Sequence, residues 1–219
     1  AKVVNLSLGV PGYALHPDWN ALYSRLSVAL LTKQTIFVHA AGNDGVTQTK
    51  DFAWNFANDP AMIVVGSVGP AGQISAFSNT PGTTCLLNNR KCLEQNRLMN
   101  RFLVAPGEWI LVSDGNGGVT RRSGTSFAAP QVTGAIALLQ SRWSWLKSKP
   151  RETVDIILSL ATDLGAPGVD PVYGRGLLNI AASQAPLDYS TLYQNVASKT
   201  GVVTKSYLTL TNPNEAGIL

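Results

Sequence analysis

The sequence predicts an α/β fold in which helices cover both faces of a mostly parallel sheet. Strand-like and helix-like segments alternate near the start of the chain, which is typical of βαβ units and their parallel strands. Hydrophobic residues make up 45% of the 219 residues and charged residues only 14%, a balance that suits strands buried on both faces. A run of small and apolar residues at 128–139 predicts a buried helix beside such a sheet.

The first half of the chain carries the clearest periodicities. Apolar side chains recur at helical spacing between residues 18 and 31, and β-branched or aromatic residues cluster in short runs elsewhere. In chain order, these patterns predict a strand at residues 3–8, a helix at 18–31, and strands at 35–40, 62–68 and 73–77.

The second half begins with a long polar excursion at residues 79–101, which contains both cysteines. The sheet is expected to resume after it, and Pro150 stands where a helix start is favoured. The predicted elements are strands at 102–104 and 110–112, a turn at 114–118, and helices at 128–139, 152–161 and 177–182.

Composition excludes several classes of function. The net charge of +4 comes from 17 basic and 13 acidic residues, and the basic residues are not interleaved with aromatic ones, so no nucleic acid partner is expected. No apolar run reaches the ~18 residues that span a bilayer, so no transmembrane segment is expected. Two cysteines and two distant histidines make a poor metal set.

The chain is expected to divide at about residue 184. Residues 1–184 carry the α/β pattern, and the first of them already form a core strand, so the chain is expected to start inside a domain. Residues 185–219 carry strand-like runs at 202–204 and 207–210 among Ser, Thr and Asn, and we interpret them as a linker or the start of a following segment.

Ser126 is the strongest candidate for chemistry. It lies at the start of the predicted helix at 128–139, where peptide dipoles favour the negative charge that develops during acyl transfer. A serine there is also a common helix N-cap, so local sequence leaves both roles open. The elbow pattern Gly-x-Ser-x-Gly of ester and lipid hydrolases fails, because Ala128 stands in place of the second glycine.

Five segments in order resemble the subtilisin-like serine peptidases, and together they cover about residues 1–184. The segment Gly124-Thr125-Ser126 with Ala129-Pro130 resembles the nucleophile motif of that family. The others are the strand at 3–9, the strand and turn at 37–45, the loop at 104–107 and the segment at 173–179. Residues 1–184 are therefore interpreted as the C-terminal portion of such a domain, with its N-terminal part missing.

This resemblance implies a role for each matching residue. Ser126 would be the nucleophile of a serine endopeptidase, with Asn43 and the backbone N–H of Ser126 as oxyanion donors. On local sequence alone, Asn43 is also a turn residue beside a glycine. The substrate would be a polypeptide, bound along the strand edge Ser7, Leu8 and Gly9, while Ala40, Ala41 and Gly42 would wall its main side-chain pocket.

The base that a serine nucleophile needs is not assigned within the chain. The family's Asp and His precede its serine, so both are expected in an upstream segment. His16 and His39 lack the family's surrounding motif, and His39 is expected to be a packed strand residue. The alternative function is a non-catalytic member of the same fold that only binds peptides.

The resemblance also bears on location and ligands. The family is largely exported, so a secreted or cell-surface protein is expected, and the following segment resembles that of autotransporter peptidases. In that setting, Cys85 and Cys92 are expected to form a disulfide within one exposed excursion. No cofactor is expected; calcium often binds in the family, but no site for it is assigned here.

Overall fold

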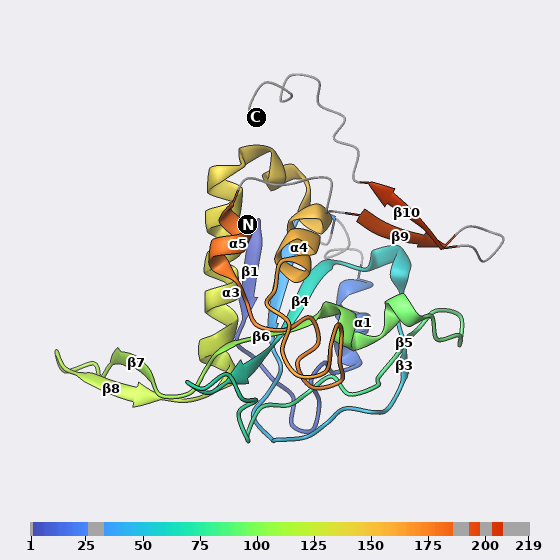
Figure 1. Ribbon diagram of the computed structural model, residues 1–219. Coiled ribbons are helices and arrows are strands. Elements are labelled where there is room, and N and C mark those ends of the chain that lie inside the picture. Colours follow the sequence, from blue (N-terminus) through green and yellow to red (C-terminus); the bar gives the residue numbers. More distant parts are fainter. Residues whose placement is uncertain (1, 26–32, 186–192, 198–202, 208–219) are drawn as a thin grey trace. The chain divides into compact units, whose positions relative to one another are not determined.

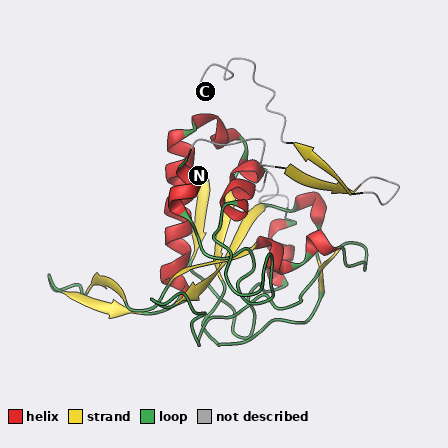
Figure 2. Cartoon of the chain, viewed as in Figure 1, coloured by secondary structure: helices red, strands yellow, loops and turns green. Residues whose placement is uncertain are grey.

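The computed structural model describes residues 2–25, 33–185, 193–197 and 203–207. The chain separates into two compact units, residues 1–184 and residues 185–219. The first unit holds a four-stranded sheet with helices and long loops around it, as Figures 1 and 2 show.

The sheet of the first unit is entirely parallel, with strand order β1-β2-β4-β6. Its central strands are buried along their whole length, as expected for a parallel sheet covered on both faces. The strands are β1 (Val3–Leu6), β2 (Ile36–Ala40), β4 (Ala61–Val68) and β6 (Phe102–Pro106).

One face of the sheet is covered by α1 (Asp18–Tyr23) together with loops. Tyr23 and Trp54 belong to the same buried cluster as Phe37, Met62 and Val64, which project from the sheet. Side chains alternate between faces along a strand, so the intervening buried residues line the opposite face. There the sheet is contacted by α3 (Thr125–Arg142) and α4 (Pro150–Ser159), which confirms helices on both faces.

All four predicted helices form with other bounds than expected: α3 and α4 begin three and two residues before the predicted 128 and 152. The helix predicted at 18–31 ends at Tyr23, Ser24 is its C-cap, and residues 26–31 lie outside the described part. The helix predicted at 177–182 starts three residues later, as α5 (Ile180–Gln184). Leu177 instead forms isolated β-bridges with Val104 in β6 and with Thr162, so its backbone is extended and not helical.

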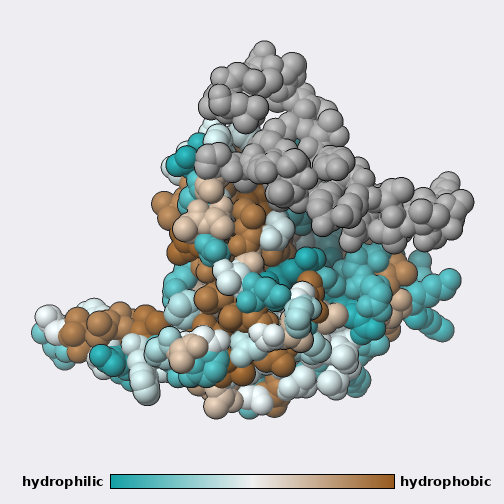
Figure 3. Space-filling model, viewed as in Figure 1, coloured by the Kyte–Doolittle hydropathy of each residue, from teal (hydrophilic) through white to brown (hydrophobic). Residues whose placement is uncertain are grey.

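Two predicted strands do not join the main sheet. Residues 73–77 contribute only an isolated bridge, between Ile74 and Val68. Residues 110–112 belong to β7 (Ile110–Ser113), which pairs with β8 (Val119–Arg122) in an antiparallel ribbon around the predicted turn. The ribbon extends away from the sheet (Figure 1), and Figure 3 shows apolar surface along it. Leu111 and Val119 are large exposed apolar residues of its two strands.

The excursion at residues 79–101 is more ordered and more buried than its polar composition suggests. It contains β5 (Leu86–Leu87), paired with β3 (Phe52–Ala53), and the short 3-10 helices η2 (Glu94–Asn96) and η3 (Leu98–Arg101). Leu86 and Leu98 are fully buried and join the cluster under the sheet. A few buried apolar side chains therefore anchor a segment whose composition is otherwise typical of a surface loop.

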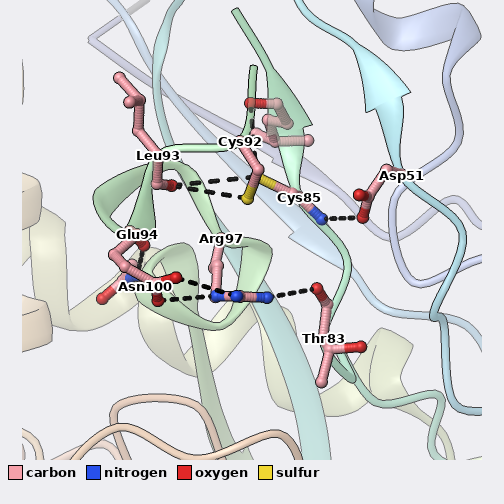
Figure 4. The surroundings of a disulfide bond; sticks show 9 residues. Asp51, Thr83, Cys85, Cys92, Leu93, Glu94, Arg97 and Asn100 are labelled. Carbon is pink, nitrogen blue, oxygen red and sulfur yellow. Dashed lines mark hydrogen bonds and ion pairs between the residues drawn. A yellow bond between two sulfur atoms is a disulfide. The ribbon is translucent and has the colours of Figure 1, made fainter. Parts of the chain in front are cut away.

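A disulfide closes part of this excursion, which confirms the predicted pairing of Cys85 with Cys92. Figure 4 shows that the Cys85 backbone N–H donates to Asp51 Oδ1, over 2.7 Å. In the same view, Arg97 binds Glu94 and donates to the carbonyl of Thr83. The excursion is thus bound to the Asp51 side chain outside it and cross-linked internally by the disulfide and by Arg97.

The second unit contains the antiparallel pair β9 (Tyr193–Ala197) and β10 (Val203–Tyr207). The pattern of the sequence predicted strand character around Val203 and Tyr207, but not the partner strand β9. The interpretation of residues 185–219 as a linker falls mostly on residues outside the described part, so it stays a prediction. None of the helices in the described part is long and apolar enough to cross a membrane.

Candidate active site

The predicted site residues gather at one edge of the parallel sheet. Ser7 directly follows β1, and Ala41 and Gly42 directly follow β2, so both segments leave the sheet at its carboxyl edge. At the same edge, the Gly124 N–H donates to the carbonyl of Gly107, just after β6 (2.8 Å), which brings the start of α3 there. Open parallel sheets bind ligands at this edge.

Ser126 is the second residue of α3 and is half-buried. The N-cap position is taken by Gly124, whose φ of +155° suits a residue without a side chain, and the Ser126 side chain does not cap the helix. A capping role for Ser126 is therefore wrong. Within the described residues, the Ser126 hydroxyl has no hydrogen-bond partner, so it remains available for chemistry.

Asn43 is held against the first residue of α3. Its Oδ1 accepts hydrogen bonds from the backbone N–H of Thr125 (2.8 Å) and from Thr125 Oγ1 (2.9 Å). Thr125 Oγ1 in turn accepts a bond from the Gly42 N–H (3.1 Å). Because a backbone N–H can only donate, the amide oxygen of Asn43 must face Thr125. The exposed Asn43 therefore turns its Nδ2 away, and this atom has no partner among the described residues.

The predicted substrate strand, residues 7–9, lies against the start of α3 and against the turn at Gly42. Ser7 Oγ donates to the carbonyl oxygen of Ser126 (3.1 Å). A Cβ at Gly9 would come within 3.3 Å of Gly42 Cα, so the two glycines let their backbones approach closely. Leu8, between Ser7 and Gly9 in the sequence, is 61% exposed. Three segments distant in sequence thus meet around Ser126.

All three residues of the predicted pocket wall are buried. Gly42 adjoins Gly9, as described above, and Ala40 and Ala41 are 4% and 0% exposed. Both alanines lie at the end of β2, and the Ala41 N–H donates to the Val65 carbonyl (2.9 Å). Their part in a side-chain pocket stays a prediction.

Neither histidine is placed as a base for Ser126. His39 is buried in β2, where its Nε2 shares a hydrogen bond with the Tyr23 hydroxyl (2.7 Å), which confirms it as a packed strand residue. Burial lowers the pKa of His39 to about 3, so it is neutral at physiological pH. His16 Nδ1 accepts a bond from the Asp18 N–H (3.1 Å) in a surface loop.

Two residues near the site were not predicted from the sequence. Thr125 lies inside the recognised motif but had no role, and Asn79 lies at the start of the polar excursion. Both make side-chain hydrogen bonds to residues more than thirty positions away, which no local pattern reports. Among the described residues, no group of His, Cys, Asp and Glu is arranged to hold a metal ion.

Comparison with known proteins finds one family. The sequence profile described as "Subtilase family" matches residues 1–176. Serotype-specific antigen 1 of Mannheimia haemolytica is 32% identical over 157 residues, covering 67% of this chain and 15% of that protein. The Neisserial autotransporter lipoprotein NalP of Neisseria meningitidis is 29% identical over 170 residues (72% and 15%). A subtilisin of Bacillus pumilus is 29% identical over 182 residues (83% and 56%).

Solved structures agree with these relatives. The patellamide maturation protease PatA is 28% identical with a TM-score of 0.60, covering 84% of this chain and 62% of that chain. The prenylagaramide maturation protease PagA is 27% identical, also with a TM-score of 0.60. The chain thus spans about 15% of the first two relatives and a little over half of the subtilisin.

Proposed function

Because this chain belongs to the subtilase family, we propose that it carries the nucleophile and the oxyanion donors of a serine endopeptidase. The observation that supports this best is the pairing of Asn43 with Thr125, which brings a side-chain amide beside the start of α3. In this proposal, Asn43 Nδ2 and the backbone N–H of Ser126 are the two donors to the oxyanion.

In the proposed reaction, Ser126 Oγ attacks the carbonyl carbon of the scissile peptide bond. A base takes the proton from Oγ and later gives it to the departing amine, and water then hydrolyses the acyl-enzyme. The negative charge that develops on the carbonyl oxygen is accepted by Asn43 Nδ2 and the Ser126 N–H, and the N-terminal end of α3 favours it further. These steps need no cofactor.

The proposed substrate is an extended polypeptide. The segment Ser7-Leu8-Gly9 leaves the sheet beside Ser126. The substrate would pair with this segment as an added strand. Ala40, Ala41 and Gly42 would wall the pocket for one of its side chains, and their small size favours a large apolar or aromatic one.

We propose that the base and its orienting carboxylate come from an upstream segment, because His39 is buried and bonded to Tyr23. An exported or cell-surface location is proposed from the relatives, which include an autotransporter lipoprotein and an extracellular serine protease of Serratia marcescens.

The test is labelling with a serine-directed fluorophosphonate. The chain alone should react slowly, because the Ser126 hydroxyl keeps its proton without a base. The polypeptide extended upstream should react rapidly, and Ser126→Ala should abolish the label. Ser123→Ala is the matched control, since Ser123 lies three residues away and should not affect labelling.

Two results would count against the proposal. Rapid labelling of the chain alone would mean that a base lies within it. An extended polypeptide that binds peptides but never labels at Ser126 would be a peptide-binding protein instead.

A further inference from the structure

Asn79 is a fully buried amide whose polar atoms are all engaged. Its Oδ1 accepts from the backbone N–H groups of Asp44 (3.0 Å) and Val46 (3.1 Å). Its Nδ2 donates to the carbonyl of Tyr13 (3.0 Å) and to Asp44 Oδ2 (3.2 Å). Its own backbone N–H donates to the carbonyl of Gly42 (3.1 Å). A buried network with every member satisfied rigidifies its surroundings.

These bonds fall on both sides of Asn43. Gly42 precedes Asn43, and Asp44 and Val46 follow it, so the turn that carries Asn43 is bound to Asn79 before and after that residue. The approach is close: a Cβ at Gly42 would lie 2.5 Å from Asn79 Nδ2, and Gly42 has a φ of +97°. Only glycine fits there without strain.

We propose that Asn79 is a positioning residue that aims Asn43 at the oxyanion. This inference rests on the proposed function, in which Asn43 Nδ2 is a donor. Asn43 is itself exposed, so its position depends on the turn and on Thr125 rather than on packing around it. Thr125 in α3 holds the Asn43 side chain, and Asn79 holds the backbone of the turn.

The proposal predicts an effect on kcat rather than on KM. An oxyanion donor acts on charge that exists only in the transition state, so misplacing it weakens that state and not substrate binding. Removing such a donor costs about 10²–10³-fold in kcat, a magnitude established on subtilisin, itself a member of this family. A loosened donor should cost less, about 10- to 100-fold.

Gln48 offers a matched control. It is also a buried amide, with Oε1 accepting from the N–H groups of Ala14 (2.7 Å) and Leu15 (2.9 Å) and Nε2 donating to the Leu15 carbonyl (3.1 Å). Its side chain holds the loop at 14–15 and not the turn that carries Asn43. Gln48→Ser therefore removes comparable bonds without touching that turn.

The first measurement is hydrogen exchange in the longer polypeptide that includes the upstream segment. Asn79→Ser should speed exchange of the Asp44 and Val46 amides by about tenfold or more, because each loses its acceptor. Gln48→Ser should leave both amides protected. Equal protection of these amides in the two variants would show that Asn79 does not hold the turn, whatever the activity of the protein.

The second measurement is peptide hydrolysis by the same polypeptide with Asn79→Ser, Asn43→Ala and both changes together. Asn79→Ser should lower kcat about 10- to 100-fold and change KM less than about threefold. With Asn43 already replaced by Ala, Asn79→Ser should have little further effect on kcat, because the donor it positions is gone. Effects of the two substitutions that multiply independently would overturn the inference.

Different results would refute the proposed function and the role of Asn79. An Asn43→Ala variant with unchanged kcat, or a Ser126→Ala variant that still hydrolyses peptides, would refute the proposed function. A damaging Asn43→Ala beside a harmless Asn79→Ser would refute only the role of Asn79.

Discussion

At the scale of single residues, His39 shows how a titratable side chain is accommodated in the core. It lies in the middle of the buried sheet, and Trp19 meets its ring edge-on at 4.7 Å between centroids. Only Nε2 has a partner, the Tyr23 hydroxyl, while Nδ1 is buried without one. A proton on this ring would place an unpaired charge in the core, which explains why burial holds the His39 pKa at about 3.

Stability should consequently depend on pH through His39. Below its ordinary pKa of 6.5 the unfolded chain binds a proton that the folded chain refuses, so the free energy of unfolding falls as pH drops from 6.5 toward 3. The slope is about 1.4 kcal/mol per pH unit for one proton. His39→Gln, which keeps a polar group near Tyr23, should lose that contribution, as urea unfolding at pH 7, 6, 5 and 4.5 would show.

Tyr23→Phe is the comparison variant, because it removes the hydroxyl partner but keeps the titrating ring. It should be less stable at every pH and retain the wild-type slope. Parallel stability profiles for the wild type and His39→Gln would contradict this account of the ring.

At the scale of elements, Asp59 joins segments that the chain connects only distantly. It stands just before β4, and its carboxylate is 2% exposed. Arg101 in η3 donates to both carboxylate oxygens (2.6 and 2.8 Å), and Trp54 Nε1 donates to one of them (2.8 Å). Arg151 near the start of α4 reaches the Asp59 carbonyl over 2.6 Å. The excursion and α4 are thus fastened to the same end of one central strand.

Asp59→Ala should therefore be strongly destabilising. It leaves the Arg101 charge, 17% exposed, and the Trp54 indole without their acceptor, and breaking a buried pair in this way costs about 3–5 kcal/mol. Arg151→Ala is the matched change on the exposed side of the cluster, where Arg151 is 59% exposed, and should cost less than about 1 kcal/mol. Chemical denaturation of both variants measures the difference, and similar losses would refute this ranking.

At the scale of the whole molecule, the core of the first unit extends almost to the boundary at residue 184. Its last helix belongs to that core: Ser183 in α5 is 1% exposed, and Gln184 Nε2 donates to the Ala135 carbonyl in α3 (3.2 Å). The boundary between the units falls directly after this contact.

Truncation should locate that boundary. Removing residues 185–219 should shift the unfolding midpoint of the first unit by less than about 2 °C, because none of its described core is lost. Removing residues 180–219 also deletes α5, uncovers part of α3, and should lower the midpoint by several degrees. Thermal scans of both truncations beside the full chain provide the measurement. An equal loss in both would show that the second unit supports the first.

Much of the fold and the outline of the site could be predicted from the sequence, because the relevant signals are local. Continuous apolar runs locate the buried strands β2, β4 and β6, and the small-residue run locates α3. The serine at the start of that helix, with four other segments in order, points to the family that the comparisons show. Short-range periodicity predicts which residues are buried, and a set of motifs in the right order indicates the family.

Only the tertiary structure decided how those parts are held. Asn43 meets Thr125 across 82 positions, and Asn79 meets Asp44 across 35, so both contacts exist only once the sheet has aligned its carboxyl ends. Burial of Leu86 and Leu98 likewise turns a polar excursion into part of the core. Side-chain hydrogen bonds and packing between distant segments depend on where the backbone places them, and no window of sequence contains both partners.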